Sequence, residues 1–115
     1  IIGCGVVIEK GAIVRDSIIM QNAVIKEGAV IDKAIIAEQA VIGERAQLGV
    51  GEEVPNKVKP AVYAFGLTVI GEKAVVPPDV KIGKNTAVTG ITIPEDYPDG
   101  VLASGETLDK AGDVA

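Results

Sequence analysis

The residues that come nearest to a chemical motif are two glycine pairs, Gly3–Gly5 and Gly49–Gly51. A Gly-x-Gly pair opens the dinucleotide-binding motif, in which a third glycine allows close packing where a helix N-terminus meets the pyrophosphate. Ile8 and Val54 stand where that third glycine belongs, and no phosphate-binding loop ending in Gly-Lys-Ser/Thr is found. We therefore interpret both pairs as corner glycines that supply positive φ angles.

Histidine is absent from the 115 residues, and Cys4 is the single cysteine. The chain by itself therefore lacks histidine general acid–base catalysis, Ser-His and Cys-His nucleophile pairs and histidine-ligated metals. One cysteine also excludes an intramolecular disulfide and a cysteine-rich zinc site. We expect Asp16, Asp32 and Glu38 to be solvated at corners, and we predict no catalytic and no metal-binding residue in this chain.

The net charge of -5 is unevenly distributed. Residues 1–94 carry ten acidic and ten basic residues, whereas residues 95–115 carry six acidic residues and one basic residue. No basic block is present, so we expect no nucleic-acid partner. No apolar run approaches the roughly 20 residues of a membrane span, and no signal peptide is visible, so we expect a cytoplasmic protein without membrane contact.

Apolar residues recur along the chain with a period that does not fit a helix. Steps of 6, 6 and 5 residues lead from one anchor to the next, so the pattern repeats every 17 residues. The anchors of the first run are Ile2, Ile8, Val14, Ile19, Ile25, Ile31, Ile36, Ile42 and Leu48, and those of the second run are Ile70, Val76, Ile82 and Val88. A helix would instead place apolar residues at i, i+3, i+4 and i+7. The repeat favours strands, as does a core built from β-branched residues.

This period predicts a coil with three short sides. Each hexad gives one short strand and one corner, and anchors one turn apart stack about 4.8 Å from each other, the spacing of paired strands. Small residues fit the narrow inner corners; they are Ala12, Ala23, Ala29, Ala40 and Ala46. We therefore predict an all-β fold, a single-stranded parallel β-helix with 17–18 residues per coil, over residues 1–94.

The repeat fails between Leu48 and Val69, and we predict that residues 49–66 leave the coil as a loop. Tyr63 and Phe65 make this segment more apolar than a solvated loop requires. We expect these two side chains to dock onto another domain or subunit, with an ordinary solvent loop as the alternative. Residues 95–115 are predicted to form an extended acidic tail, loosely ordered from residue 99.

Residues 15–53 and 55–84 resemble the C-terminal β-helix of bacterial ADP-glucose pyrophosphorylase, also called glucose-1-phosphate adenylyltransferase. The resemblance depends on Asp-Ser-Ile-Ile-Met at 16–20, Lys-Ala-Ile-Ile at 33–36 and Thr-Val-Ile-Gly-Glu at 68–72. The hexads also resemble those of left-handed β-helices. Left-handed coiling is implied by that resemblance, because general rules predict right-handed crossovers. Related mannose-1-phosphate guanylyltransferases share this architecture and are an alternative.

The resemblance implies a role in a larger enzyme, which joins glucose 1-phosphate to ATP with Mg²⁺ and releases ADP-glucose and pyrophosphate in glycogen biosynthesis. The family's catalytic machinery lies in an N-terminal nucleotidyltransferase domain, and no residue of that machinery is found in this chain. Mg²⁺ and ATP are therefore implied for the parent enzyme alone. For this part of it, the resemblance implies homo-oligomerisation and a share in allosteric control.

Anionic effectors such as sugar phosphates bind basic residues between the two domains of this family. Lys33, before Ala-Ile-Ile, and Lys73, after Thr-Val-Ile-Gly-Glu, stand near such positions. The resemblance thus implies effector binding for both, while solvated corner lysines are the other interpretation.

Two classes of function remain open. The chain begins at an anchor pair, Ile1–Ile2, without a methionine or a cap, and we therefore expect a fragment of a longer protein. The alternative is a stand-alone scaffolding solenoid. A hexapeptide acyltransferase is disfavoured, because such enzymes use a histidine as general base.

Overall fold

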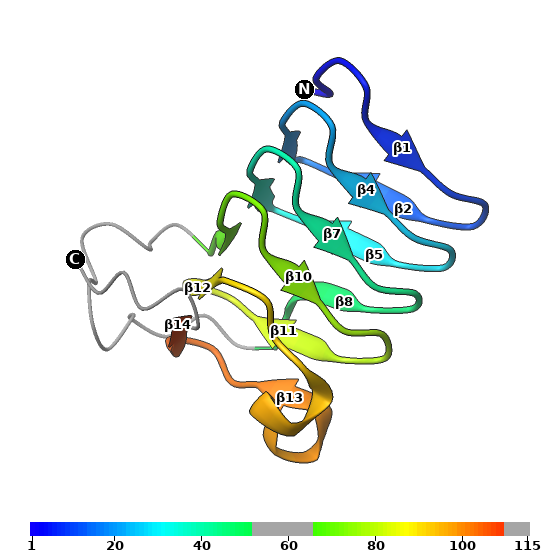
Figure 1. The fold of residues 1–115 in the computed structure, drawn as a ribbon. Coiled ribbons are helices and arrows are strands. Elements are labelled where there is room, and N and C mark those ends of the chain that lie inside the picture. The colour runs from blue at the N-terminus through cyan, green and yellow to red at the C-terminus, as the bar shows by residue number, and fades with distance from the viewer. Residues whose placement is uncertain (52–65, 110–115) are drawn as a thin grey trace.

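A computed structural model describes residues 1–51 and 66–109. Fourteen short parallel strands form three sheets, with two 3-10 turns and no α-helix among the described residues. In Figure 1 successive coils lie one below another from the N-terminus, each contributing a strand to each side. This architecture is a parallel β-helix, and it agrees with the predicted left-handed, hexapeptide-repeat coil.

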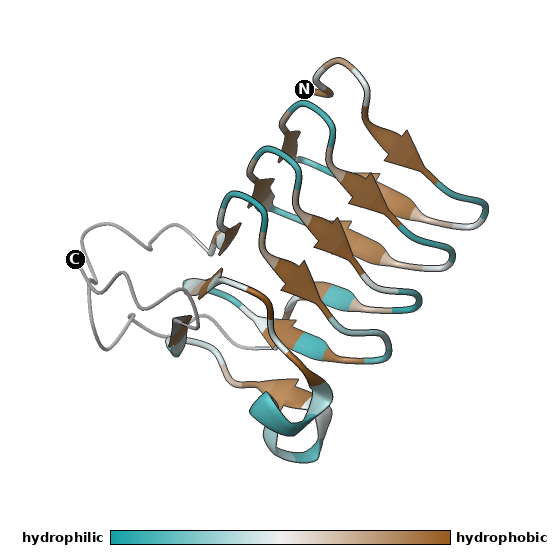
Figure 2. Cartoon of the chain, in the orientation of Figure 1, coloured by the Kyte–Doolittle hydropathy of each residue, from teal (hydrophilic) through white to brown (hydrophobic). Residues whose placement is uncertain are grey.

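The first sheet has the order β1-β4-β7-β10. Its strands are β1 (Val7–Ile8), β4 (Val24–Ile25), β7 (Val41–Ile42) and β10 (Val75–Val76). Figure 2 shows apolar colouring on all four strands of this sheet. The second sheet has the order β13-β11-β8-β5-β2. Its strands are β2 (Ile13–Arg15), β5 (Val30–Asp32), β8 (Gln47–Val50), β11 (Lys81–Gly83) and β13 (Val101–Leu102).

The third sheet has the order β14-β12-β9-β6-β3. Its strands are β3 (Ile18–Ile19), β6 (Ala34–Ile36), β9 (Thr68–Ile70), β12 (Thr86–Thr89) and β14 (Thr107–Asp109). Each sheet thus takes one strand from nearly every coil, as three hexads per turn require.

The pairing register is the one that the 17-residue period predicts. Ile8 pairs with Ile25, and Ile25 pairs with Ile42, in parallel ladders inside the first sheet. The anchors of the middle coils are buried without measurable exposure: Ile25, Ile31, Ile36, Ile42, Leu48, Ile70, Ile82 and Val88. Four of the five predicted corner alanines are also fully buried: Ala23, Ala29, Ala40 and Ala46. The fifth, Ala12, packs against the core while partly exposed.

Among the anchors that the period predicts, exposure rises at the N-terminal coil. Ile2 is 52% exposed and Ile8 is 42% exposed, although both occupy inward-facing positions of the repeat. Ile1, Ile2, Ile8 and Val14 line a hollow of about 540 Å³ at this end of the coil. The interior of the described coil is therefore open at its first turn.

The corners rely on left-handed backbone, including at non-glycine residues. Asn22, Gln39 and Lys73 occupy the same corner in successive coils with φ near 60°. Asn tolerates this conformation better than other L-residues, because its short polar side chain bonds locally. Gly49 has φ 88°, and a Cβ there would collide with the carbonyl oxygen of Asp32, so this position requires glycine.

The coil is interrupted where the apolar repeat fails, between β8 and β9. β9 pairs directly with β6, so the chain between β8 and β9 adds no strand between them. Residues 52–65 lie outside the described residues, and with them most of the predicted loop 49–66. Gly49 and Val50 still belong to β8.

The prediction of an extended tail is wrong for residues 95–109. η1 (Pro94–Asp96) and η2 (Pro98–Gly100) lead into β13 and β14, which extend the second and third sheets. Leu102 and Leu108 continue the anchors, because they pair with Ile82 and Val88. The coil therefore extends past residue 94. Ile91 continues its first side by a parallel bridge to Val75, and the two 3-10 turns lie between that bridge and β13.

Tyr97 is the residue that fixes this last coil. Its side chain is 2% exposed and belongs to the core. The Thr92 hydroxyl donates to the carbonyl oxygen of Val75 at 2.6 Å, so the Tyr97 hydroxyl is the donor in its 2.9 Å bond to Thr92. Burial raises the pKa of Tyr97.

Candidate functional site

Lys33 lies at the corner between the second and third sheets. Its φ of 51° turns the chain from β5 into β6, and its side chain is exposed. The backbone of Lys33 is held by the coils on both sides. Its amide donates to the Arg15 carbonyl at 3.1 Å, and its carbonyl accepts from the Thr68 amide at 3.1 Å. A fixed backbone and a free ammonium group are compatible with binding an anion at this corner.

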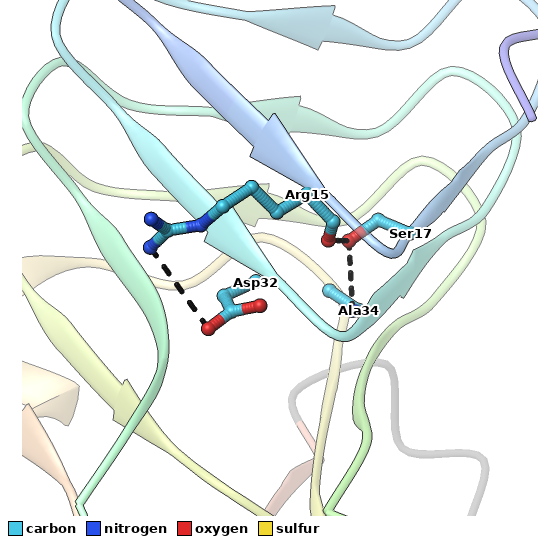
Figure 3. A network of polar contacts seen from close by, with 4 residues as sticks. All are labelled: Arg15, Ser17, Asp32 and Ala34. Carbon is cyan, nitrogen blue, oxygen red and sulfur yellow. Dashed lines mark hydrogen bonds and ion pairs between the residues drawn. The ribbon is translucent and has the colours of Figure 1, made fainter.

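The Lys33 corner is shaped by residues of the coil before it (Figure 3). The Ser17 hydroxyl donates to the Arg15 carbonyl at 2.6 Å and accepts from the Ala34 amide at 3.0 Å. Arg15 and Asp32 form an exposed ion pair with 3.9 Å between nitrogen and oxygen. Ser17 is a corner residue that the period of anchors does not identify, although a serine between two strands is a common signal of a side chain that bonds the backbone at a turn.

Lys73 lies at a different corner, between the third and first sheets. It is exposed, has φ 60°, and its amide donates to the Glu38 carbonyl at 2.9 Å. Lys33 precedes β6 whereas Lys73 follows β9, and these two strands are neighbours in the third sheet. The two lysines therefore lie at opposite ends of the strands of that sheet, and the fold does not bring them into one site.

Neither of the two predicted interface residues can be placed. Tyr63 and Phe65 both lie outside the described residues. Their role at an interface stays a prediction.

The third corner, between the first and second sheets, carries the best-defined ion pair. Arg45 and Asp79 form two bonds, from Nε to Oδ1 at 2.7 Å and from the second guanidinium nitrogen to Oδ2 at 3.0 Å. The hydrogen bond raises the pKa of Arg45 and lowers the pKa of Asp79. Both side chains are exposed, so solvent screens the pair and its contribution to stability is small.

Candidate metal ligands are not clustered in the part of the chain that the structure describes. No three histidine, cysteine, aspartate or glutamate residues come close enough there to hold a metal ion. Cys4 is exposed at the corner between the third and first sheets, where its carbonyl accepts from the Asn22 amide. Among residues 1–51 and 66–109, no helix is long and apolar enough to cross a membrane.

Comparison with known proteins gives the family. A family model described as the GMPPB C-terminal domain matches residues 1–73. The glucose-1-phosphate adenylyltransferase of Lachnospira eligens is 52% identical over 65 residues, which cover 56% of this chain and 15% of that protein. The protein of the same name from Acetivibrio thermocellus is 40% identical over 67 residues, or 58% of this chain and 16% of that protein.

A third relative is the glucose-1-phosphate adenylyltransferase of Thermotoga maritima, 47% identical over 60 residues. The matches span only about 15% of the length of these curated relatives. No solved structure matches the chain significantly. Because the family model covers well over half of the sequence, the chain belongs to the family of the GMPPB C-terminal domain.

Proposed function

We propose that this chain is the oligomerisation and allosteric β-helix domain of a glucose-1-phosphate adenylyltransferase. The parent enzyme would convert ATP and glucose 1-phosphate to ADP-glucose and pyrophosphate, for glycogen biosynthesis in the cytoplasm. The observation that carries the proposal is 52% identity to an enzyme of that name over 65 residues. We also propose that the coil of this chain is left-handed, as the resemblance to that enzyme family implies.

We propose further that the catalytic steps take place outside this chain. The chain has no histidine, and its described part has no metal-binding cluster. We assign Mg²⁺ and ATP to an N-terminal nucleotidyltransferase domain of the parent enzyme. The function left to this chain is to assemble subunits and to respond to effectors.

For effector binding we propose Lys33 and Lys73 as two separate contacts. Both ammonium groups are exposed at corners whose backbone is held by the neighbouring coils. Because the lysines lie at different corners, each would meet an anionic effector together with basic residues outside this chain. For assembly we propose that the chain forms homo-oligomers and that Tyr63 and Phe65 contribute to a subunit or domain contact.

A second candidate is the same domain in another sugar-1-phosphate nucleotidyltransferase. It is favoured by the match to the GMPPB C-terminal domain model. The test is an assay of the polypeptide that carries this chain, with Mg²⁺ and either ATP plus glucose 1-phosphate or GTP plus mannose 1-phosphate. ADP-glucose formation is the expected result. GDP-mannose formation would select the second candidate, and the absence of both products would leave a scaffolding solenoid.

A further inference from the structure

We draw no further inference here: the strongest candidate, the apolar hollow at the first coil that Ile1, Ile2, Ile8 and Val14 line, is an unpartnered face, and nothing in the described part of the chain shows what covers it.

Discussion

Ile25 pairs in register with Ile42 on the inner side of the first sheet, and neither side chain is exposed. The residues next to them, Val24 and Val41, form the same pairing on the outer side and are half-exposed. One step along the strand thus separates a core position from a surface position.

Replacing Ile25 by Asp tests this register. An unpaired carboxylate would be buried between Ile8 and Ile42, and we expect a loss of about 4 kcal/mol or more in the free energy of unfolding. Lys26→Asp, one residue further, is the control and should cost about 0.5 kcal/mol or less. Urea unfolding at low micromolar concentration measures both. Equal losses would show that the inward and outward positions are assigned wrongly.

Gly49→Ala tests the left-handed backbone position within β8. Its φ of 88° is unfavourable for alanine, and the added Cβ would collide with the Asp32 carbonyl. We expect a loss of about 3 kcal/mol. Gly11→Ala is the matched control, because Gly11 has φ 77° while no atom lies closer than 3.8 Å to the added Cβ. It should lose about 1 kcal/mol. If the two variants unfold at the same urea concentration, the close approach to Asp32 is refuted.

Tyr97 makes stability depend on alkaline pH. Burial raises its pKa above the ordinary value of 10.0, so the folded chain keeps the phenol proton where the unfolded chain has lost it. The contribution is complete below pH 10 and decreases as the pH rises toward the folded-state pKa. Tyr97→Phe should remove this dependence and cost about 1 kcal/mol at neutral pH, since one hydrogen bond is lost. Thermal unfolding between pH 8 and 11 compares the two proteins, and parallel curves would contradict burial of the phenol.

Lys33 and Lys73 should act separately on effector response. In the parent enzyme, Lys33→Ala or Lys73→Asn is expected to raise the effector concentration for half-maximal response about tenfold, with basal activity unchanged. Asn suits the left-handed backbone at residue 73, so this variant removes the charge without straining the corner. Lys81→Ala is the control, because Lys81 is exposed on the second sheet away from both corners. An unchanged response to the effector in both variants would identify the two lysines as solvated corner residues.

Most of the fold could be predicted because the period is a local property of the sequence. The ladder from Ile8 through Ile25 to Ile42 follows from spacing alone, since a shift by one residue would expose every anchor. The C-terminal coil could not be predicted, because the period is irregular there. Leu102 and Leu108 are six residues apart, but they lie in an acidic segment, and two 3-10 turns lengthen the chain between the bridge at Ile91 and β13.

The surfaces were harder to predict. Val7, Val24, Val41 and Val75 are visible in the sequence as apolar residues before anchors, yet three sheets carry such residues. Only the pairing of strands shows which of them form an uninterrupted row. Lys33 and Lys73 could be placed at corners, but their separation depends on which corner each occupies.

The most direct test of the account is a domain exchange. The residues of the Lachnospira eligens glucose-1-phosphate adenylyltransferase that align with this chain are replaced by this chain, to which they are 52% identical over 65 residues. We expect the hybrid to keep the native subunit number in sedimentation and to form ADP-glucose, whereas the same enzyme without this region should lose its assembly. A hybrid that folds but dissociates into monomers would contradict the assignment of this chain as the assembly domain of such an enzyme.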